Sequence, residues 1–313
     1  MTTIKDIAKE VGVSVATVSR ALNDSGYASS GVKKKVLDAA RKLNYVPNEV
    51  ARSLYNNKSR VIGVLVPDIS NPYFPRMIRG IEDAANENNY RILLGNTDQN
   101  IDKEKKYLEI FHQNNCAGII TATWTVEKSI QNLKVPVVMI DRVNDKYVSV
   151  EADNFKGGRI QADHLIEQGA KHILIIAGPE KYSSFRNRTI GASERLNDLK
   201  INCEVKDSIS VRTLMDKSDV KFFRGFDGII CPNDMYAYEV LSFLNENNIN
   251  IPSEIKIIGF DDLEFSKWVS PELTTVRQPI YEMGKEAFAL LIQEDEKNKR
   301  NILDVELIQR KST

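Results

Sequence analysis

The stretch TIKDIAKEVGVSVATVSRALN, residues 3–23, contains two helical patterns separated by one glycine. Apolar residues recur at the spacing of one helix face, at Ile4, Ile7, Ala8 and Val11. Thr3 can cap this first helix, Gly12 suits the left-handed position that ends it, and Ser14 can cap the second. The stretch therefore predicts two short helices joined by a tight turn.

The predicted second helix has one apolar face and one face of short, hydrogen-bonding side chains. The apolar face carries Val15, Val18 and Leu22, and the other carries Ala16, Thr17, Ser19 and Arg20. Short side chains let a helix approach base edges in the major groove of DNA, and an arginine can reach a guanine or a phosphate. We therefore predict that the second helix reads DNA.

Two further helical segments follow. Residues 30–43 predict a third helix, packed through Val32, Val36, Leu37, Ala40 and Leu43. Its lysines at 33–35 suit the DNA backbone. Pro47 stops this helix, and Asn48 can cap a short helix whose apolar patch is Val50, Ala51 and Leu54. Because so short a helix is unstable alone, we expect it to fold only when paired with its twin on DNA.

Charge is distributed unevenly along the chain. The first 60 residues carry eleven lysines and arginines against five aspartates and glutamates, whereas the whole chain carries 43 of each class. A basic head on an acidic body indicates that the head binds a polyanion.

From residue 61 onward, short apolar runs alternate with helical patterns. The runs are VIGVLV, RILLGN, GIIT, VPVVMID, HILIIAG, DGIICP and IKIIGFDD. Continuous runs of Val, Ile and Leu between helices are typical of parallel strands buried on both faces. Their number predicts two sheets of doubly wound α/β architecture.

Polar residues follow these runs repeatedly. They are Asp68, Asn96, Asp98, Asp141, Arg142, Asn233, Asp234, Asp261 and Asp262. In open parallel sheets, ligands bind beyond the carboxyl ends of the strands. Carboxylates, amides and arginine beside an aromatic such as Phe74 suit a sugar, whose hydroxyls exchange hydrogen bonds and whose ring face stacks. The alternative is that each Asp or Asn only caps the helix that follows it.

The sequence lacks the motifs of the common catalytic classes. It has no G-x-S-x-G elbow, no G-x-G-x-x-G loop and no P-loop, and its three histidines have no partner motif. No cysteine or histidine cluster has metal-ligand spacing. No apolar run could span a membrane, and the amino terminus lacks the pattern of a secretory signal. We expect a cytoplasmic protein that is not an enzyme and uses no metal or cofactor.

Three stretches, TIKDIAKEVGVSVATVSRALN, LNYVPNEVARSL and IGVLVPDISNPYF, resemble the LacI/GalR family of bacterial transcription regulators. The resemblance covers essentially the whole chain. It implies a homodimer on a palindromic operator, with the second helix in the major groove and a leucine of the hinge helix wedged into the minor groove. The DNA-binding residues that it implies are Thr3, Ser14, Ala16, Thr17, Ser19, Arg20, Asn23, Tyr45, Asn48, Ala51, Arg52 and Leu54.

The resemblance also implies a domain organisation. Residues 1–46 would form the helix-turn-helix domain, 47–59 the hinge helix and linker, and 60–313 a two-lobed effector-binding and dimerisation domain resembling periplasmic binding proteins. We expect lobe 1 to comprise about 60–154 and 277–290, and lobe 2 about 155–276 and 291–313.

The motifs NPYF, FRNRTIG, CPND and GFDD match the family's effector site. They imply a pocket formed by Asp68, Asn71, Tyr73, Phe74, Ser184, Arg188, Asp234, Asp261 and Gln278. We predict a repressor of a sugar-utilisation operon whose effector is ribose, or else sucrose or another sugar. The chain carries Ser270 where catabolite regulators that answer to a phosphorylated carrier protein have arginine, which disfavours that alternative. A sugar receptor that does not bind DNA is disfavoured by the basic head.

Overall fold

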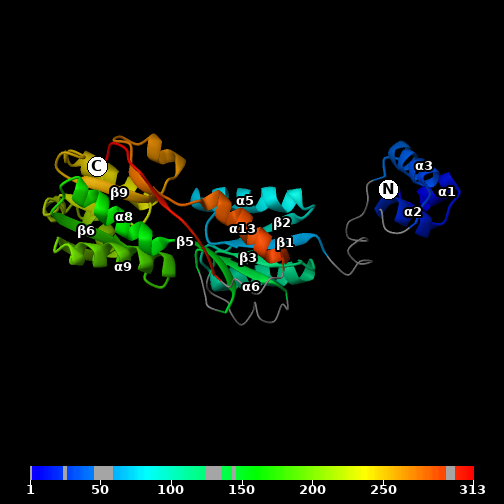
Figure 1. The fold of residues 1–313 in the computed structure, drawn as a ribbon, viewed down its shortest axis with the longest axis horizontal. Helices are drawn as coiled ribbons and strands as arrows, with labels where there is room; N and C mark the ends of the chain where they lie inside the picture. Colours follow the sequence, from blue (N-terminus) through cyan, green and yellow to red (C-terminus); the bar gives the residue numbers. More distant parts are fainter. Residues whose placement is uncertain (1, 24–26, 46–58, 124–134, 143–145, 294–299) are drawn as a thin grey trace. The chain divides into compact units, whose positions relative to one another are not determined.

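The computed structural model describes residues 2–23, 27–45, 59–123, 135–142, 146–293 and 300–313. The chain divides into two compact units, Met1–Ser59 and Arg60–Thr313. The first is helical and the second contains two sheets covered by helices (Figure 1).

The first unit is a three-helix bundle. Its helices are α1 (Ile4–Val11), α2 (Val15–Asn23) and α3 (Ser30–Lys42). The turn between α1 and α2 forms as predicted, because Gly12 adopts a left-handed φ of 73° and its N–H donates to the carbonyl of Ala8. The Thr17 N–H donates to Ser14 Oγ at 3.1 Å, which confirms Ser14 as the cap of α2.

The predicted packing of the bundle is wrong at two positions. Leu37 is 38% exposed, whereas α3 buries Val36, as predicted, and Ala39, which was not predicted. In α2, Val18 is fully buried, but Val15 is 41% exposed. Val36 and Ala39 are three residues apart and therefore lie on the same face of α3, which packs against the core of the bundle. Leu37, the residue after Val36, points to a different side of the helix.

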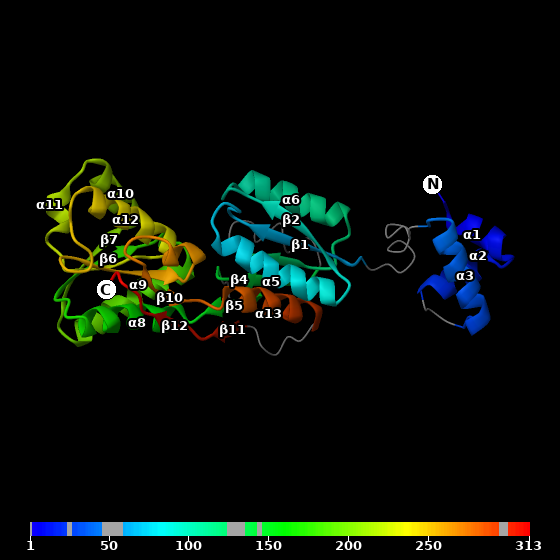
Figure 2. The same ribbon diagram turned by 90° about the horizontal axis from the view of Figure 1, so that it is seen from above.

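The first lobe of the second unit is a parallel sheet covered on both faces. Its strand order is β11-β5-β4-β3-β1-β2. The strands are β1 (Val61–Val66), β2 (Arg91–Asn96), β3 (Ile119–Thr121), β4 (Val137–Ile140), β5 (Val148–Ala152) and β11 (Arg300–Leu303). Helices α5 (Tyr73–Glu87) and α13 (Ile280–Gln293) cover one face, and α6 (Ile101–Gln113) covers the other (Figure 2).

The second lobe repeats this layered architecture. Its strand order is β12-β10-β9-β8-β6-β7. The strands are β6 (His172–Ala177), β7 (Asn202–Asp207), β8 (Gly228–Ile230), β9 (Lys256–Asp261), β10 (Thr274–Arg277) and β12 (Glu306–Ile308). Its helices are α8 (Asn154–Glu167), α9 (Ser183–Asp198), α10 (Ser208–Asp216), α11 (Val220–Phe223), α12 (Asp234–Glu246) and the 3₁₀ helix η1 (Glu264–Lys267). Among the described strands, all pairs are parallel except β10 with β12.

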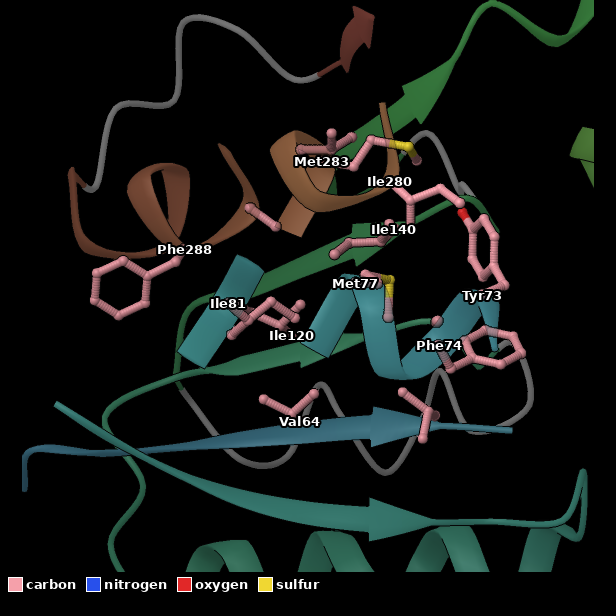
Figure 3. Packing of buried hydrophobic residues seen from close by; sticks show 14 of the residues in the cluster. Val64, Tyr73, Phe74, Met77, Ile81, Ile120, Ile140, Ile280, Met283 and Phe288 are labelled. Carbon is pink, nitrogen blue, oxygen red and sulfur yellow. The ribbon is translucent and has the colours of Figure 1, made fainter. Parts of the chain in front are cut away.

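The core of the first lobe explains why the sequences of its strands are continuously apolar. In Figure 3, Met77 of α5 and Met283 of α13 pack over Val64 and Ile140 of the sheet, and all four are almost fully buried. A strand that is covered by helices on both faces has no solvent side, so its sequence is continuously apolar. The predicted doubly wound fold class is confirmed, and all seven apolar runs contain strands.

The chain crosses between the lobes three times. It passes to the second lobe between β5 and α8, returns between β10 and α13, and crosses again between β11 and β12. The expected assignment of residues 291–313 to lobe 2 is therefore wrong for residues 291–293 and 300–303. Helix α13 continues to Gln293 in the first lobe, and β11 pairs in parallel with β5 as the outer strand of the first sheet.

Candidate functional site

A cavity of about 310 Å³ lies between the two lobes, where the carboxyl ends of strands from both sheets meet. The first lobe contributes Pro67, Asp68, Asn71, Tyr73, Phe74, Gln99, Asp141 and Arg142 to its lining. The second lobe contributes Pro179, Tyr182, Phe185, Arg188, Arg212, Asn233 and Asp261. The cavity thus combines carboxylates, amides, guanidinium groups and aromatic rings from both lobes.

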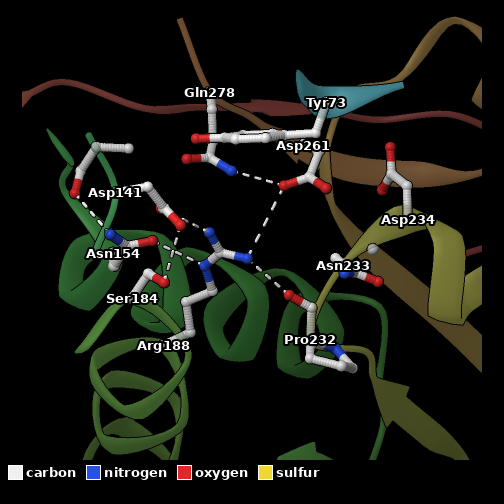
Figure 4. A network of polar contacts seen from close by, with 12 residues as sticks. Tyr73, Asp141, Asn154, Ser184, Arg188, Pro232, Asn233, Asp234, Asp261 and Gln278 are labelled. Atoms are coloured by element: carbon white, nitrogen blue, oxygen red, sulfur yellow. Dashed lines mark hydrogen bonds and ion pairs between the residues drawn. The ribbon is translucent and has the colours of Figure 1, made fainter. Parts of the chain in front are cut away.

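Arg188 on α9 is the most connected side chain in the cavity wall (Figure 4). Its Nε donates to Asn154 Oδ1 and its Nη1 donates to the carbonyl of Pro232, both at 2.8 Å. Carboxylate oxygens of Asp141 and Asp261 lie 3.9 and 3.8 Å from its terminal nitrogens. Because the guanidinium is almost fully buried, these partners compensate for its desolvation and fix its orientation.

Two glycines explain how Arg188 reaches Asn154. A Cβ at Gly191 of α9 would collide with the carbonyl oxygen of Phe155, and a Cβ at Gly158 of α8 would collide with that of Arg188. Only glycine permits so close an approach of two helix backbones. The R-x-x-G pattern therefore has a structural reason, because its glycine brings α9 against α8 and its arginine against Asn154.

Asp261 occupies the carboxyl end of β9 with an unusual backbone conformation. Its φ is 124°, and Gln278 Nε2 donates to its Oδ1 at 2.6 Å. The ring of Phe260 lies beneath Arg188, whose Cζ is 3.8 Å from the ring centroid. Burial raises the pKa of Asp261 well above its usual range, although the nearby charge of Arg188 opposes this shift.

Two polar atoms in the cavity wall have no hydrogen-bond partner among the described residues. They are the hydroxyl of Tyr73 and the Oδ1 of Asp141. Burial, together with the charges of Asp141 and Asp261, raises the pKa of Tyr73, so this phenol stays protonated as a donor. Buried polar groups without partners are costly, and hydroxyl groups of a ligand could satisfy both.

Comparisons with known proteins identify the two units. Residues 3–48 match the family described as bacterial regulatory proteins, lacI family, and residues 162–313 match the periplasmic binding protein-like domain. The ribose operon repressor of Bacillus subtilis strain 168 is 41% identical over 297 residues, which are 93% of this chain and 91% of that protein. The chain belongs to the lacI family of bacterial regulatory proteins. This confirms the resemblance, and the chain is a DNA-binding transcription regulator.

Two solved structures of lacI-type regulators are similar to the second unit. One, from Alkaliphilus metalliredigens, is complexed with D-xylulofuranose; it is 33% identical and covers 82% of this chain and 99% of its own, with a TM-score of 0.75. The other, from Enterococcus faecium, has bound ribose; it is 28% identical and covers 81% of this chain and 98% of its own, with a TM-score of 0.72.

Six of the nine effector residues expected in this lacI-family protein line the cavity. They are Asp68, Asn71, Tyr73, Phe74, Arg188 and Asp261. Ser184 and Gln278 lie behind the wall, where their side chains donate to Asp141 and Asp261. These two residues position the lining carboxylates.

Asp234 was expected in the pocket, but it is fully buried inside the second lobe. Its carboxylate accepts hydrogen bonds from Thr275 Oγ1, the Leu263 N–H and Ser266 Oγ, at 2.6, 2.8 and 2.8 Å. Its neighbour Asn233 lines the cavity instead. The CPND motif therefore supplies one residue to the cavity and the next to the interior, because successive residues at the start of α12 point in different directions.

Several lining residues were missing from the expected set. Asp141, Arg142 and Asn233 stand at strand ends, so the strand-end rule identifies their position but not their role. Gln99, Tyr182, Phe185 and Arg212 carry no such signal, because only the meeting of the two lobes brings them to the cavity.

The expected DNA-reading face of α2 has mixed exposure. Ala16 and Arg20 are exposed, whereas Thr17 and Ser19 are half-buried. Thr17 Oγ1 lies 2.9 Å from Ser14 Oγ, so these hydroxyls form part of the helix cap. Ala16 and Arg20 therefore remain the most accessible members of this face.

The other expected DNA contacts fall in four places. Thr3 precedes α1, where its N–H and hydroxyl donate to Asp6 at 2.8 Å, and Tyr45 packs against the core of the bundle. Asn23 is the last residue of α2. Asn48, Ala51, Arg52 and Leu54 lie outside the described residues.

Among the residues that the structure describes, no group of three or more His, Cys, Asp and Glu side chains could hold a metal ion. Across the same part of the chain, no helix combines the length and apolarity needed to cross a membrane.

Proposed function

We propose that this regulator is a homodimeric repressor of a sugar-utilisation operon, and that ribose bound between its lobes modulates operator binding. The observation that carries the effector proposal is the cavity, in which the buried Tyr73 hydroxyl and the Asp141 Oδ1 atom have no hydrogen-bond partner among the described residues. The relative from Bacillus subtilis is named a ribose operon repressor, and the regulator from Enterococcus faecium has bound ribose. Both support ribose over sucrose as the first effector to test.

The lining suits a small sugar chemically. Sugar hydroxyls can donate to Asp141 and Asp261 and accept from Arg188, while Phe74 and Phe185 offer aromatic faces to the apolar side of the ring. We therefore assign the cavity a binding role, with no reaction, metal or cofactor.

The DNA-binding part of the proposal rests on the first unit. Exposed Ala16 and Arg20 would meet base edges in the major groove, with Thr17 and Ser19 beside them. Leu54 and Ala51 would lie in the minor groove at the centre of the operator. A two-fold dimer requires a near-palindromic site, and binding to an operator places the protein in the cytoplasm.

Coupling between the two sites follows from the connections between lobes. A sugar that contacts both lobes stabilises one relative arrangement of them. Because the first unit joins the chain at the first lobe, that arrangement would favour or oppose pairing of the two hinge helices in the dimer.

Fluorescence anisotropy tests the proposal directly. The full-length protein is titrated onto a labelled palindromic duplex from upstream of its own operon, at fixed salt, with ribose, xylulose, sucrose or no sugar. We expect tight specific binding that ribose changes by at least about tenfold, which corresponds to a coupling free energy of about 1.4 kcal/mol. Specific binding that no sugar changes would contradict the effector proposal and favour a protein co-effector.

Two variants separate the roles in this assay. Leu54→Ala is expected to weaken specific operator binding and to leave sugar affinity unchanged. Asp261→Ala is expected to abolish the sugar response while operator binding remains. Unchanged operator affinity in the first variant would remove Leu54 from the interface, and a normal response in the second would place the effector elsewhere.

A further inference from the structure

Tyr182 connects the two lobes at the wall of the cavity. It belongs to the second lobe, where it precedes α9, and only 5% of its surface is exposed. Its hydroxyl donates to Gln99 Oε1 at 3.1 Å, and the Cζ of Arg142 lies 3.8 Å from its ring centroid. Because Gln99 and Arg142 both belong to the first lobe, Tyr182 makes a two-sided contact across the cleft.

Gln99 lies in a turn after β2 that is stabilised by side-chain contacts. Asp98 and Gln99 both have left-handed φ values, of 50° and 55°. Asn96 Nδ2 donates to Asp98 Oδ1 at 2.6 Å, and Lys103 forms an ion pair with the same side chain. These contacts hold the backbone of the turn, which carries Gln99 at the wall of the cavity.

Arg142 depends more strongly on Tyr182. The residue is 8% exposed, and among the described residues its guanidinium forms no hydrogen bond or ion pair. Stacking on the electron-rich face of the tyrosine ring is favourable for such a cation, and more so away from water. If the lobes separated, Arg142 would lose this contact and Gln99 would lose its donor.

We propose that Gln99, Arg142 and Tyr182 form an inter-lobe latch that controls the exchange of the effector. The inference rests on the proposed function, in which the cavity holds a sugar. A sugar enclosed by both lobes enters or leaves only when they separate, and separation breaks both contacts of Tyr182. The latch therefore slows entry and release together, so its loss changes both rates more than it changes the equilibrium affinity.

The rate of release of radiolabelled ribose, chased with unlabelled ribose, tests the latch in the full-length protein. Tyr182→Phe keeps the stacked ring and removes only the hydrogen bond, and Gln99→Leu removes its acceptor from the other lobe. We expect each variant to release ribose about three to ten times faster, the effect of losing one hydrogen bond. The double variant should be no faster than either single variant, because both remove the same contact.

A matched control is available within one lobe. The Tyr281 hydroxyl donates to Asp83 Oδ2 at 2.9 Å, and both residues belong to the first lobe. Tyr281→Phe removes a tyrosine hydrogen bond without touching the cleft, so its release rate should equal that of the wild type. Unchanged release from Tyr182→Phe, equal acceleration in the control, or additive effects in the double variant would each overturn the latch.

Hydrogen exchange measured by mass spectrometry without sugar separates failure of the latch from failure of the effector assignment. We expect peptides covering residues 96–100 and 179–186 to exchange faster in both single variants than in wild type and control. Equal exchange in all four proteins would overturn the latch. If wild type does not bind ribose, the proposed effector is wrong, whereas this measurement still decides whether Gln99 and Tyr182 hold the lobes together.

Discussion

At the scale of single residues, Arg188 shows how a buried charge becomes a recognition group. Its contacts come from four separate segments, namely Asn154 of α8, Pro232 after β8, Phe260 of β9 and Asp141 after β4. A planar guanidinium can use all of these at once, since it stacks with one face while its edge donates in fixed directions. A lysine has the same charge and lacks this geometry.

Arg188→Lys should therefore weaken ribose binding about 10- to 100-fold, equivalent to roughly 1.5–3 kcal/mol for lost charge-assisted hydrogen bonds. Operator affinity without sugar should stay at the wild-type value, because the first unit is unchanged. Calorimetric titration with ribose and anisotropy on the operator measure the two quantities. Wild-type ribose affinity in this variant would show that the guanidinium edge does not bind the sugar.

Asp234 leads to a prediction about pH. Burial raises its pKa to about 7, although hydrogen bonds from Thr275, Leu263 and Ser266 oppose the shift. The unfolded value is about 3.9, so between these values the folded state binds more protons than the unfolded state. The free energy of unfolding should therefore fall as pH rises through this window.

Urea unfolding of the wild type and of Asp234→Asn at pH 5 and pH 8 measures this effect. The wild type should lose up to about 3 kcal/mol between the two conditions, at about 1.4 kcal/mol per pKa unit. The variant cannot titrate at this position and should lose less. The same loss in both proteins would mean that Asp234 is ionised in the fold throughout this range.

At the scale of helices and strands, close contacts between helix backbones organise both lobes. Gly158 and Gly191 allow α8 and α9 to touch, and Gly80 and Gly284 do the same for α5 and α13. In each pair, a Cβ would meet a backbone carbonyl of the other helix, which cannot rotate away as a side chain can.

Gly191→Ala should separate α9 from α8 and lower the free energy of unfolding by about 1–3 kcal/mol. Ribose affinity should fall as well, because Arg188 moves with α9 away from Asn154. Glu194→Ala, an exposed position on the same helix, is the control and should alter neither quantity. Stability equal to wild type in the glycine variant would show that the helices adjust at little cost.

At the scale of the whole molecule, three crossings of the chain join the two lobes. Charged side chains connect two of these crossings. Arg277 at the end of β10 donates to Asp262 and to Glu306 of β12, at 2.7 and 2.6 Å. This ion-pair network fixes the ends of β10 and β12 to each other within the second lobe, while the latch residues connect the two lobes across the cleft.

If sugar and operator favour different arrangements of the same molecule, each ligand must change the affinity of the protein for the other. Thermodynamic linkage requires that the factor by which ribose changes operator affinity equals the factor by which operator changes ribose affinity. We expect equal factors when ribose is titrated against free and operator-bound protein at the same salt concentration. Unequal factors would mean that the bound species differ in more than one equilibrium, such as dimerisation.

The helix-turn-helix and the parallel strands could be predicted from the sequence. These depend on local signals, namely the caps at Ser14 and Gly12 and the continuous apolar runs from residue 61 onward. Strand β7 (Asn202–Asp207) was not predicted, because it lies at the exposed edge of its sheet, where a polar sequence is tolerated. Strand β11 was assigned to the wrong lobe because pairing with β5 is a contact between distant residues.

Only some of the residues that line the cavity could be predicted from the sequence. Strand ends indicated Asp68 and Asp261, since the carboxyl end of a parallel strand is a property of local order. Tertiary structure alone decided that Asn233 lines the cavity while Asp234 is buried, and that Tyr182 meets Gln99 across the cleft. The physical reason is that these roles depend on the direction of each side chain and on how the two lobes approach each other. Neither produces a repeating pattern in the sequence from which it could be predicted.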